Sequence, residues 1–306
     1  MKKKYLLAAT SILCWSTVAT VVKLLLGNFT SMQVLCISAF FGAIFLLGVN
    51  LATGNIKKLR EYEPRDYLIT VLIGLPGTFF YYVFYYTGTS MMLASQAFIV
   101  NYLWPIMSVI FACIILGEKM TARKALAIGL SFLGVIIVTG KDILHFDTTT
   151  LVGALFCILG AVSYGIYTAL NQKAAKYDKR ISTMFSYTTS FILTLIINLA
   201  TGGFPKLGAV EVLGFAWNGM FTMALAGTAW MFALADGHTA KISNLAYITP
   251  FLSLILTAIF LREEISWLSV LGLVVIVGGI LIQATDKSED GIKAEKKEED
   301  KESLSE

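Results

Sequence analysis

The chain has 306 residues, of which 57% are hydrophobic and only 14% are charged, and its mean hydropathy is +0.74. A soluble globule of this size needs more polar surface than these residues supply, so the composition excludes an ordinary soluble domain and indicates an integral membrane protein. The net charge of +4 is not gathered into a continuous basic face, so we expect no nucleic-acid partner.

Ten apolar stretches follow one another along the chain, each near the roughly 20 residues that a helix needs to cross the hydrocarbon core. They are uninterrupted runs rather than the alternating segments of a barrel, so we predict an all-α integral membrane protein with ten transmembrane helices. The short loops leave no room for a soluble catalytic domain. The predicted spans are residues 5–26, 32–53, 67–87, 91–116, 122–140, 151–171, 181–201, 212–235, 239–260 and 267–284.

Lysine and arginine are concentrated in alternate loops, which predicts the orientation of the chain in the membrane. With the N-terminus inside, the external loops hold Lys141, Lys206 and Arg262. We therefore expect a multi-pass protein of the cell membrane with both termini cytoplasmic. The cytoplasmic segments then contain Lys2, Lys3, Lys4, Lys57, Lys58, Arg60, Arg65, Lys119, Arg123, Lys124, Lys173, Lys176, Lys179 and Arg180.

The two ends of the chain differ in character. The opening MKKKYLLAATSIL has the basic start of a signal peptide, but it stays apolar to Leu26 without a small-residue cleavage site. We interpret it as an uncleaved first span. Residues 286–306 mix both charge signs with almost nothing to bury, which predicts a disordered cytoplasmic tail. The four cysteines lie inside spans without metal-ligand spacing, so we expect no disulfide, metal or cofactor.

The two halves of the chain contain matching residues. Pro105 and Pro250 lie 145 positions apart, and the same interval relates Tyr102 to Tyr247. We predict two units, 1–140 and 148–285, of five spans each. Because five is odd, the second unit is inverted relative to the first, as in secondary transporters whose substrate sites lie between the repeats. The interval also relates Ser108 to Ser253, Glu118 to Glu263 and Gly134 to Gly279.

Two segments, NYLWPIMSVIFACIILGEKMT and LAYITPFLSLILTAIFLREEIS, carry a resemblance to a known group of proteins. Each has a polar-aromatic stretch, a proline and a glutamate thirteen positions later. The sequence resembles the drug/metabolite transporter superfamily, in particular members with two EamA-type repeats. The resemblance implies a ten-helix exporter of amino acids or related metabolites. The NYLWP motif is most similar to that of aromatic amino-acid exporters, and it implies a cavity around Tyr81, Tyr82, Tyr85, Tyr102 and Trp104.

Two prolines fall near the middle of predicted spans. Pro105 frees the carbonyl of Asn101, and Pro250 frees that of Ala246. A free carbonyl at membrane depth costs several kcal/mol unless protein, water or a ligand meets it. We interpret the pair as kinked helices beside a binding site. The alternative is two ordinary kinks whose backbone is satisfied by neighbouring hydroxyls.

Polar and aromatic side chains share faces of several predicted helices. Asn101, Trp104 and Ser108 have the spacing of one helix face, and Tyr164 and Tyr167 share another. We place Tyr86 in an interfacial aromatic belt. The deeper residues predict a cleft suited to a planar, amphipathic solute. The predicted substrate-binding residues are Tyr81, Tyr82, Tyr85, Asn101, Tyr102, Trp104, Tyr164, Tyr167, Ser243, Asn244 and Tyr247, with Pro105 and Pro250 as helix kinks.

The charged residues near the spans allow two interpretations each. Lys23 either snorkels to the interface or attracts a carboxylate at an external gate. Glu118 and Glu263 either cap helices or pair with Lys119 and Arg262. Since the acidic residues map to span ends, direct proton coupling is not supported, and we expect facilitated movement down the solute gradient.

An intramembrane enzyme would need a nucleophile with a base, or paired acids, inside the spans. His145 and His238 both fall in loops, so we predict no enzymatic activity. Within the transporter class, a non-aromatic amino acid, a nucleoside or a lipophilic cation remains an alternative solute. The sequence does not indicate whether the bundle forms oligomers.

Overall fold

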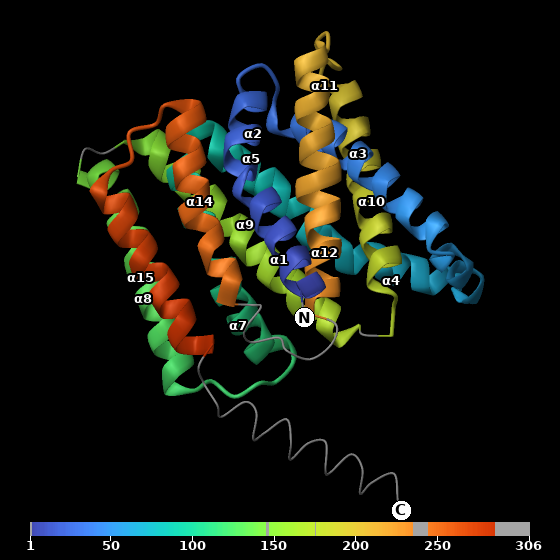
Figure 1. Cartoon of the computed structure of the whole chain (residues 1–306), viewed down its shortest axis with the longest axis horizontal. Coiled ribbons are helices and arrows are strands. Elements are labelled where there is room, and N and C mark those ends of the chain that lie inside the picture. Colours follow the sequence, from blue (N-terminus) through green and yellow to red (C-terminus); the bar gives the residue numbers. More distant parts are fainter. Residues whose placement is uncertain (1, 145–146, 175, 235–243, 285–306) are drawn as a thin grey trace, which may run out of the picture.

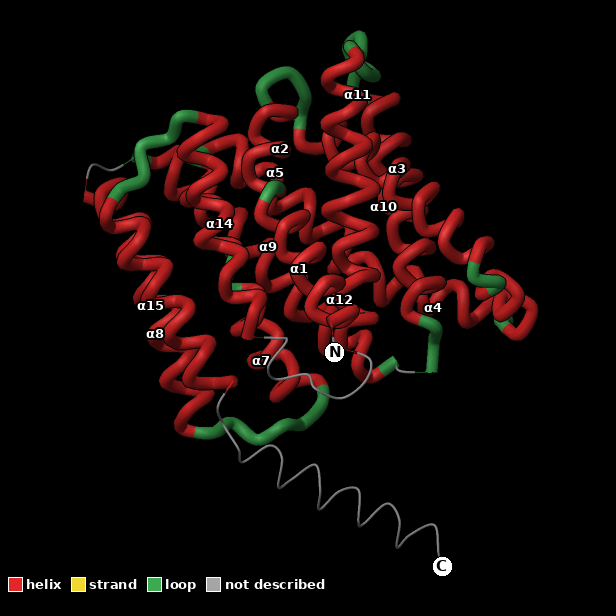
Figure 2. Tube along the Cα trace, in the orientation of Figure 1, coloured by secondary structure: helices red, strands yellow, loops and turns green. Residues whose placement is uncertain are grey.

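The computed structural model describes residues 2–144, 147–174, 176–234 and 244–284 (Figure 1). Every regular element in these ranges is a helix (Figure 2), so the prediction of an all-α chain is confirmed. The elements are α1 (Lys2–Ser16), α2 (Val18–Leu26), α3 (Ser31–Ala52), η1 (Asn55–Glu61), α4 (Pro64–Leu75), η2 (Pro76–Phe80), α5 (Tyr81–Met91), α6 (Ala94–Asn101), α7 (Trp104–Ile115), α8 (Ala122–Leu144), α9 (Thr148–Lys173), α10 (Lys179–Ala200), α11 (Ala209–Ala216), η3 (Trp217–Leu225), α12 (Ala226–Leu234), η4 (Asn244–Ile248), α14 (Thr249–Leu256), η5 (Thr257–Leu261) and α15 (Trp267–Ala284).

Several of these elements join end to end into long apolar helices. Within the described residues, eight are long and apolar enough to cross a membrane, and two shorter apolar helices, Leu245–Leu261 and Trp267–Gln283, follow them. All of them overlap the predicted spans. The first residues of the predicted ninth span and the whole predicted tail, 286–306, lie outside the described residues. The eight longer helices are Lys3–Leu26, Ser31–Ala52, Pro64–Met91, Ala94–Ile115, Ala122–Gly140, Thr148–Lys173, Lys179–Ala200 and Ala209–Trp230.

The outer surface of the bundle carries large apolar side chains. Ile114 is 68% exposed and Val210 is 80% exposed. A soluble monomer seldom exposes so much apolar surface, because water penalises it. The acyl chains of a bilayer do not penalise exposed apolar side chains, so we expect this surface to face lipid.

Both prolines lie at interruptions of an apolar stretch. Tyr102 and Leu103 separate α6 from α7, and Pro105 is the second residue of α7. Pro250 is likewise the second residue of α14, directly after the 3₁₀ helix η4. The first N–H groups of a helix have no intrahelical partner, so a proline at this position costs no hydrogen bond. Each predicted kink therefore takes the form of a new helix start.

The helices that precede the two glutamates also end alike. Gly117 follows α7 with φ 72°, and Arg262 follows η5 with φ 56°. Both residues occupy the left-handed region that commonly caps a helix. The next residues, Glu118 and Glu263, each donate a backbone N–H to the carbonyl six positions earlier, at 3.4 and 3.5 Å. These two turns are 145 positions apart, like the prolines.

One helix pair, α8 and α15, is held together by small residues (Figure 1). A Cβ atom on Gly134 would lie 2.7 Å from the carbonyl oxygen of Gly272, and one on Gly279 would lie 2.9 Å from that of Ala127. The missing side chains let the two backbones approach closely.

The remaining contacts follow a reciprocal pattern. In the first half of the chain α5 and α7 both pack against α9, and in the second half α12 and α14 both pack against α1. In the same way α4 of the first half packs against α10 of the second, and η3 of the second half packs against α3 of the first. Each half therefore contributes helices that contact the first or second long helix of the other half.

Candidate functional site

Nine aromatic side chains from four helical stretches meet inside the bundle. The segment α5 to α7 contributes six of them, and the helices α9 and α10 contribute three. We call this group the aromatic cluster. It consists of Tyr81, Tyr82, Tyr85, Tyr86, Tyr102, Trp104, Tyr164, Tyr167 and Tyr187.

Tyr164 of α9 lies at the centre of the cluster. Its ring centroid is 4.9 Å from that of Tyr81, 5.2 Å from that of Trp104 and 5.5 Å from that of Tyr167. The Trp104 contact is edge-on, a favoured geometry for aromatic rings. The sequence placed these four residues in one site, and the structure brings their rings into contact.

Two polar atoms in or beside the cluster are buried without a hydrogen-bond partner among the described residues. Asn101 donates from its Nδ2 atom to the Tyr81 hydroxyl at 3.0 Å, but its Oδ1 atom has no partner among the described residues. The hydroxyl of Tyr85, a residue only 1% exposed, has none either. Buried polar groups are nearly always paired, so unpaired ones beside a ring cluster suggest positions for ligand atoms.

The backbone carbonyl that Pro250 would leave free is satisfied within the protein. The hydroxyl of Tyr102 donates to the carbonyl of Ala246 at 2.9 Å. Tyr102 is 5% exposed and belongs to the other half of the chain, so this bond joins the two interrupted stretches. In this structure the carbonyl of Ala246 is therefore not open to a ligand.

Tyr86 does not belong to an interfacial belt, contrary to the sequence-based assignment. It is fully buried, and its hydroxyl accepts a hydrogen bond of 2.8 Å from the side chain of Asn218. Asn218 also donates to Ser38 at 2.9 Å, and it accepts from Thr222 at 2.8 Å. The assignment failed because closeness to a span end says nothing about which face a neighbouring helix covers.

Tyr187 was not among the predicted site residues, yet its ring lies 6.4 Å from that of Tyr82. Its hydroxyl donates to the carbonyl of Met223 at 3.1 Å. A signal was present in the sequence, because Ser186, Ser190 and Thr194 form a polar helical stripe beside it.

The predicted residues of the ninth span are described only in part. Ser243 lies outside the described residues, and Asn244 is described as the first residue of η4 without its side chain. Tyr247 is half-buried and packs against the apolar core.

The side chain of Lys23 extends to the end of a neighbouring span. Its ammonium donates to the carbonyl of Thr89 at 2.8 Å and to that of Met92 at 2.5 Å. Cations are stabilised at the C-terminal end of a helix, where carbonyl groups lack intrahelical donors. Lys23 therefore ties α2 to the end of α5.

The two matching glutamates have different partners. Glu263 accepts the N–H groups of Ala94 and Ser95 at 2.7 and 2.9 Å, so it caps α6. Glu118 pairs with the buried ammonium of Lys124 at 3.0 Å, and not with the expected Lys119. Of the two interpretations, capping holds for Glu263 and ion pairing holds for Glu118.

Membrane-embedded helices, interrupted spans and a buried aromatic cluster define a class, the multi-pass membrane transporters. The EamA-like transporter family matches the chain twice, over residues 2–140 and 151–285. The chain belongs to the EamA-like transporter family, and the resemblance inferred from the sequence is confirmed. Members of this family are membrane transporters rather than enzymes.

Related proteins cover most of the chain. An uncharacterized transporter from Clostridium kluyveri is 25% identical, and the match covers 96% of this chain and 97% of the relative's length. An aromatic amino acid exporter, YddG, from Ancylobacter novellus is 22% identical over 90% of this chain and 95% of its own. The YddG exporter from Escherichia coli is 28% identical over 62% of this chain and 66% of its own. A solved crystal structure with a TM-score of 0.68 and 22% identity, covering 93% of this chain and 97% of its own, has the same fold.

Proposed function

We propose that this chain exports small amphipathic metabolites, with aromatic amino acids as the favoured substrates, by alternating access between the two halves of the bundle. The observation that carries the proposal is the aromatic cluster together with the two unpaired polar atoms of Asn101 and Tyr85. Ring faces attract both an aromatic side chain and an ammonium group. The Oδ1 atom of Asn101 can accept from an ammonium, and the hydroxyl of Tyr85 can donate to a carboxylate.

The named relatives support the aromatic assignment. Two of them are described as aromatic amino acid exporters, at 22% and 28% identity. Specificity depends on the side chains of the site rather than on the fold, so the cluster carries more weight than this likeness.

The two halves, residues 1–140 and 148–285, are inferred to be inverted repeats. The prolines, the left-handed turns before the two glutamates and the glycine contacts all recur at an interval of 145 residues. The reciprocal packing of helices supports the same symmetry. Such repeats allow rocking about a central site.

The substrate site is proposed to lie at the aromatic cluster, where both repeats contribute rings. Tyr81 and Trp104 come from the first repeat, and Tyr164 and Tyr187 come from the second. Movement of one repeat against the other would separate these rings and open the site.

The orientation is inferred from the distribution of lysine and arginine, which places both termini in the cytoplasm and the chain in the cell membrane. Labelling of single introduced cysteines in intact cells measures it. If a cysteine at position 3 reacted with an impermeant reagent added outside, the orientation would be the opposite of the one proposed.

Transport of radiolabelled tryptophan by the purified protein in liposomes tests the function. We expect exchange of tryptophan and weak exchange of threonine. Trp104→Ala should reduce tryptophan exchange roughly tenfold, since an aromatic pair contributes up to about 1.5 kcal/mol and about 1.4 kcal/mol corresponds to a factor of ten. Trp267→Ala removes an indole that is 69% exposed and should leave the rate unchanged. Equal rates in the two variants would show that the substrate does not contact the aromatic cluster.

Facilitated transport is proposed because the acidic residues near the spans, such as Glu118 and Glu263, map to span ends rather than to the membrane interior, where a proton carrier would be needed. An imposed pH gradient should therefore not drive uphill accumulation of tryptophan in liposomes. Uphill accumulation that collapses with a protonophore would show proton coupling instead.

A further inference from the structure

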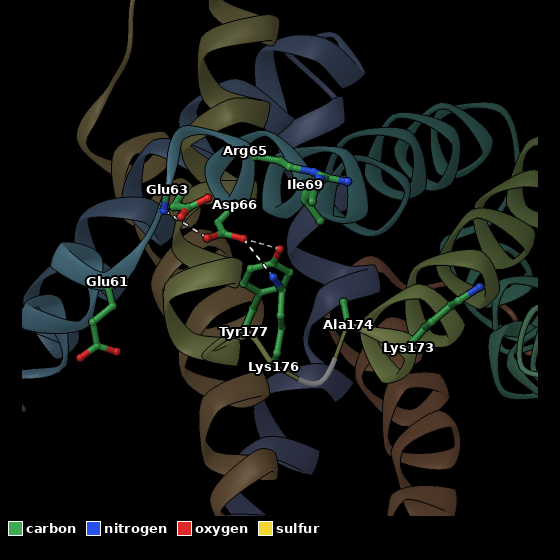
Figure 3. Close-up of a pocket in the computed structure, with 9 residues that line it drawn as sticks. All are labelled: Glu61, Glu63, Arg65, Asp66, Ile69, Lys173, Ala174, Lys176 and Tyr177. Carbon is green, nitrogen blue, oxygen red and sulfur yellow. Dashed lines mark hydrogen bonds and ion pairs between the residues drawn. The ribbon is translucent and has the colours of Figure 1, made fainter.

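A pocket of about 620 Å³ opens between the start of α4 and the end of α9 (Figure 3). Its volume lies in the usual range for small-molecule sites. The pocket is separate from the aromatic cluster and is rich in charged groups. Its lining residues are Glu61, Glu63, Arg65, Asp66, Ile69, Lys173, Ala174, Lys176 and Tyr177.

Two cations of this pocket have no ion-pair partner within the described part of the chain. Arg65 and Lys173 are exposed, and neither makes an ion pair with any described residue. They come from different halves of the chain, α4 and α9. In Figure 3 both lie on the same side of Asp66, and Glu61 and Glu63 lie on the other. The pocket therefore presents separate positive and negative sides.

The centre of the pocket is closed by a small polar cluster. Asp66 accepts a hydrogen bond of 2.7 Å from the hydroxyl of Tyr177 and pairs with Lys176 at 3.1 Å (Figure 3). The Lys176 ammonium also lies 4.6 Å from the centroid of the Tyr177 ring. The side chain of Lys176 is 69% exposed, so this ion pair contributes little stability and can be exchanged.

A second, narrow cleft adjoins Tyr177. Ala174 and Tyr177 line both the pocket and this cleft. The cleft continues between α4, α9 and α10, and its other lining residues are Thr70, Ile73, Gly74, Asn171, Ser182 and Ser186.

The helix interface that holds the cleft continues, closely packed, to the aromatic cluster. Thr78, one turn beyond Gly74, donates to the carbonyl of Ser186 at 3.2 Å. The neighbouring Gly77 faces the ring of Tyr167, which leaves no space there for a Cβ atom. The charged pocket, the narrow cleft and the aromatic cluster thus follow one another along one helix interface.

We propose that the pocket between α4 and α9 is the loading site at which a zwitterionic amino acid first binds. Arg65 and Lys173 hold the carboxylate, and Asp66 takes the ammonium in place of Lys176. The incoming ammonium binds the same Asp66 oxygen that accepts from the Tyr177 hydroxyl, so it also frees Tyr177, and the cleft opens. This inference rests on the proposed export of amino acids.

The test compares two double variants that each remove two positive charges. Arg65→Gln/Lys173→Gln alters the pocket, and Lys57→Gln/Lys179→Gln alters two exposed lysines that do not line it. Tryptophan transport is measured in each direction in oriented vesicles, and thermal unfolding checks folding. At low ionic strength the pocket variant should lose roughly tenfold in kcat/KM from the pocket side, because electrostatic steering raises on-rates by at least that factor.

Three further readouts sharpen the result. The loss should shrink in 0.5 M salt, should be absent for transport from the opposite side, and should be absent for tryptamine, which has no carboxylate. An unchanged rate, or equal losses in the two double variants, would overturn the loading site. A wild-type protein without flux would instead refute the proposed export itself.

A phospholipid with an ethanolamine headgroup carries the same pair of charges as an amino acid. The measurement is therefore made in vesicles of phosphatidylcholine and phosphatidylglycerol and repeated with phosphatidylethanolamine added. We expect the same loss in both. A difference between wild type and pocket variant that occurs only with phosphatidylethanolamine would assign the pocket to lipid and overturn the proposal.

Discussion

At the scale of single residues, the bond between Tyr102 and Ala246 shows how an interrupted helix is tolerated inside a membrane. Pro250 has no N–H to offer the carbonyl of Ala246, and the phenol of Tyr102, from a distant segment, donates to it. The replacement matters because no water is available in the acyl region to take its place.

Tyr102→Phe should lower the free energy of unfolding by about 1–3 kcal/mol, the cost of leaving a buried acceptor unpaired. An SDS-unfolding titration of the purified protein measures this change. Tyr5→Phe, at a tyrosine that is 45% exposed, is the matched control and should have no effect. Equal stability of the two variants would show that the carbonyl of Ala246 finds another donor.

Asp178 joins the segment before α10 to η1. Its carboxylate accepts from Lys58 at 2.7 Å, from Asn55 at 3.0 Å and from the N–H groups that begin α10. Partial burial raises the pKa of this carboxyl, but the hydrogen bonds from Lys58, Asn55 and the helix outweigh burial and lower the pKa from 3.8 to about 2.

The lowered pKa of Asp178 predicts a pH dependence of stability. A carboxyl with a depressed pKa stabilises the fold above its unfolded value, and that contribution disappears as the pH falls through the folded value. Wild type should therefore unfold at a higher temperature than Asp178→Asn at pH 6, and the difference should vanish between pH 4 and pH 2. Glu61→Gln, at an exposed glutamate, should show no such trend. A constant difference across this range would count against the assigned pKa.

At the scale of elements, the pairing of α8 with α15 depends on backbone contact at glycines. A side chain at Gly134 would meet Ile276 at 2.5 Å, but one at Gly129 on the same helix would meet nothing within 4 Å. The two positions share a helix and differ in what faces them.

Gly134→Val should destabilise the protein by about 1–3 kcal/mol through overpacking, and Gly129→Val should be nearly neutral in the same unfolding titration. The valine has the same helix propensity at both positions, so the difference isolates the contact. Comparable losses would mean that propensity, and not packing, explains these glycines.

At the scale of the whole molecule, the two ends of the bundle differ. At the end where α2 stops, Lys23 and Glu263 hold the turn between α5 and α6 from both sides, one through its carbonyls and one through its N–H groups. At the other end lies the charged pocket between α4 and α9. We call the end tied by Lys23 and Glu263 the closed end of the bundle.

Glu263→Gln should loosen the closed end. It replaces a charged acceptor of two N–H groups with a neutral one, and a loss of about 1.4 kcal/mol corresponds to tenfold in the open population. The measurement is the rate at which a cysteine introduced at Met92 reacts with a membrane-impermeant maleimide, in a background without the native cysteines. Met92 is 5% exposed, so the wild-type rate should be low.

Glu264→Gln provides the control for the closed end, because Glu264 is the exposed neighbour of Glu263. Its reaction rate should match that of the parent protein. A rate in Glu263→Gln that equals the control would show that Lys23 alone closes this end.

Much of the fold could be predicted because its signals are local. The length of each apolar run indicates a helix, and Pro105 and Pro250 mark where helices restart. The family resemblance likewise rested on two contiguous segments. The site was predicted less completely, since Tyr187 was missed and Tyr86 was misplaced.

The sequence by itself determined an all-helical membrane chain with interrupted spans, because run length and proline chemistry act on a residue and its near neighbours. Tertiary structure decided which side chains meet. Tyr102 reaches Ala246, and Glu263 reaches the start of α6, across more than 100 residues of chain. Such contacts depend on how each helix is rotated toward its neighbours, and that rotation is set by the packing of all the helices together.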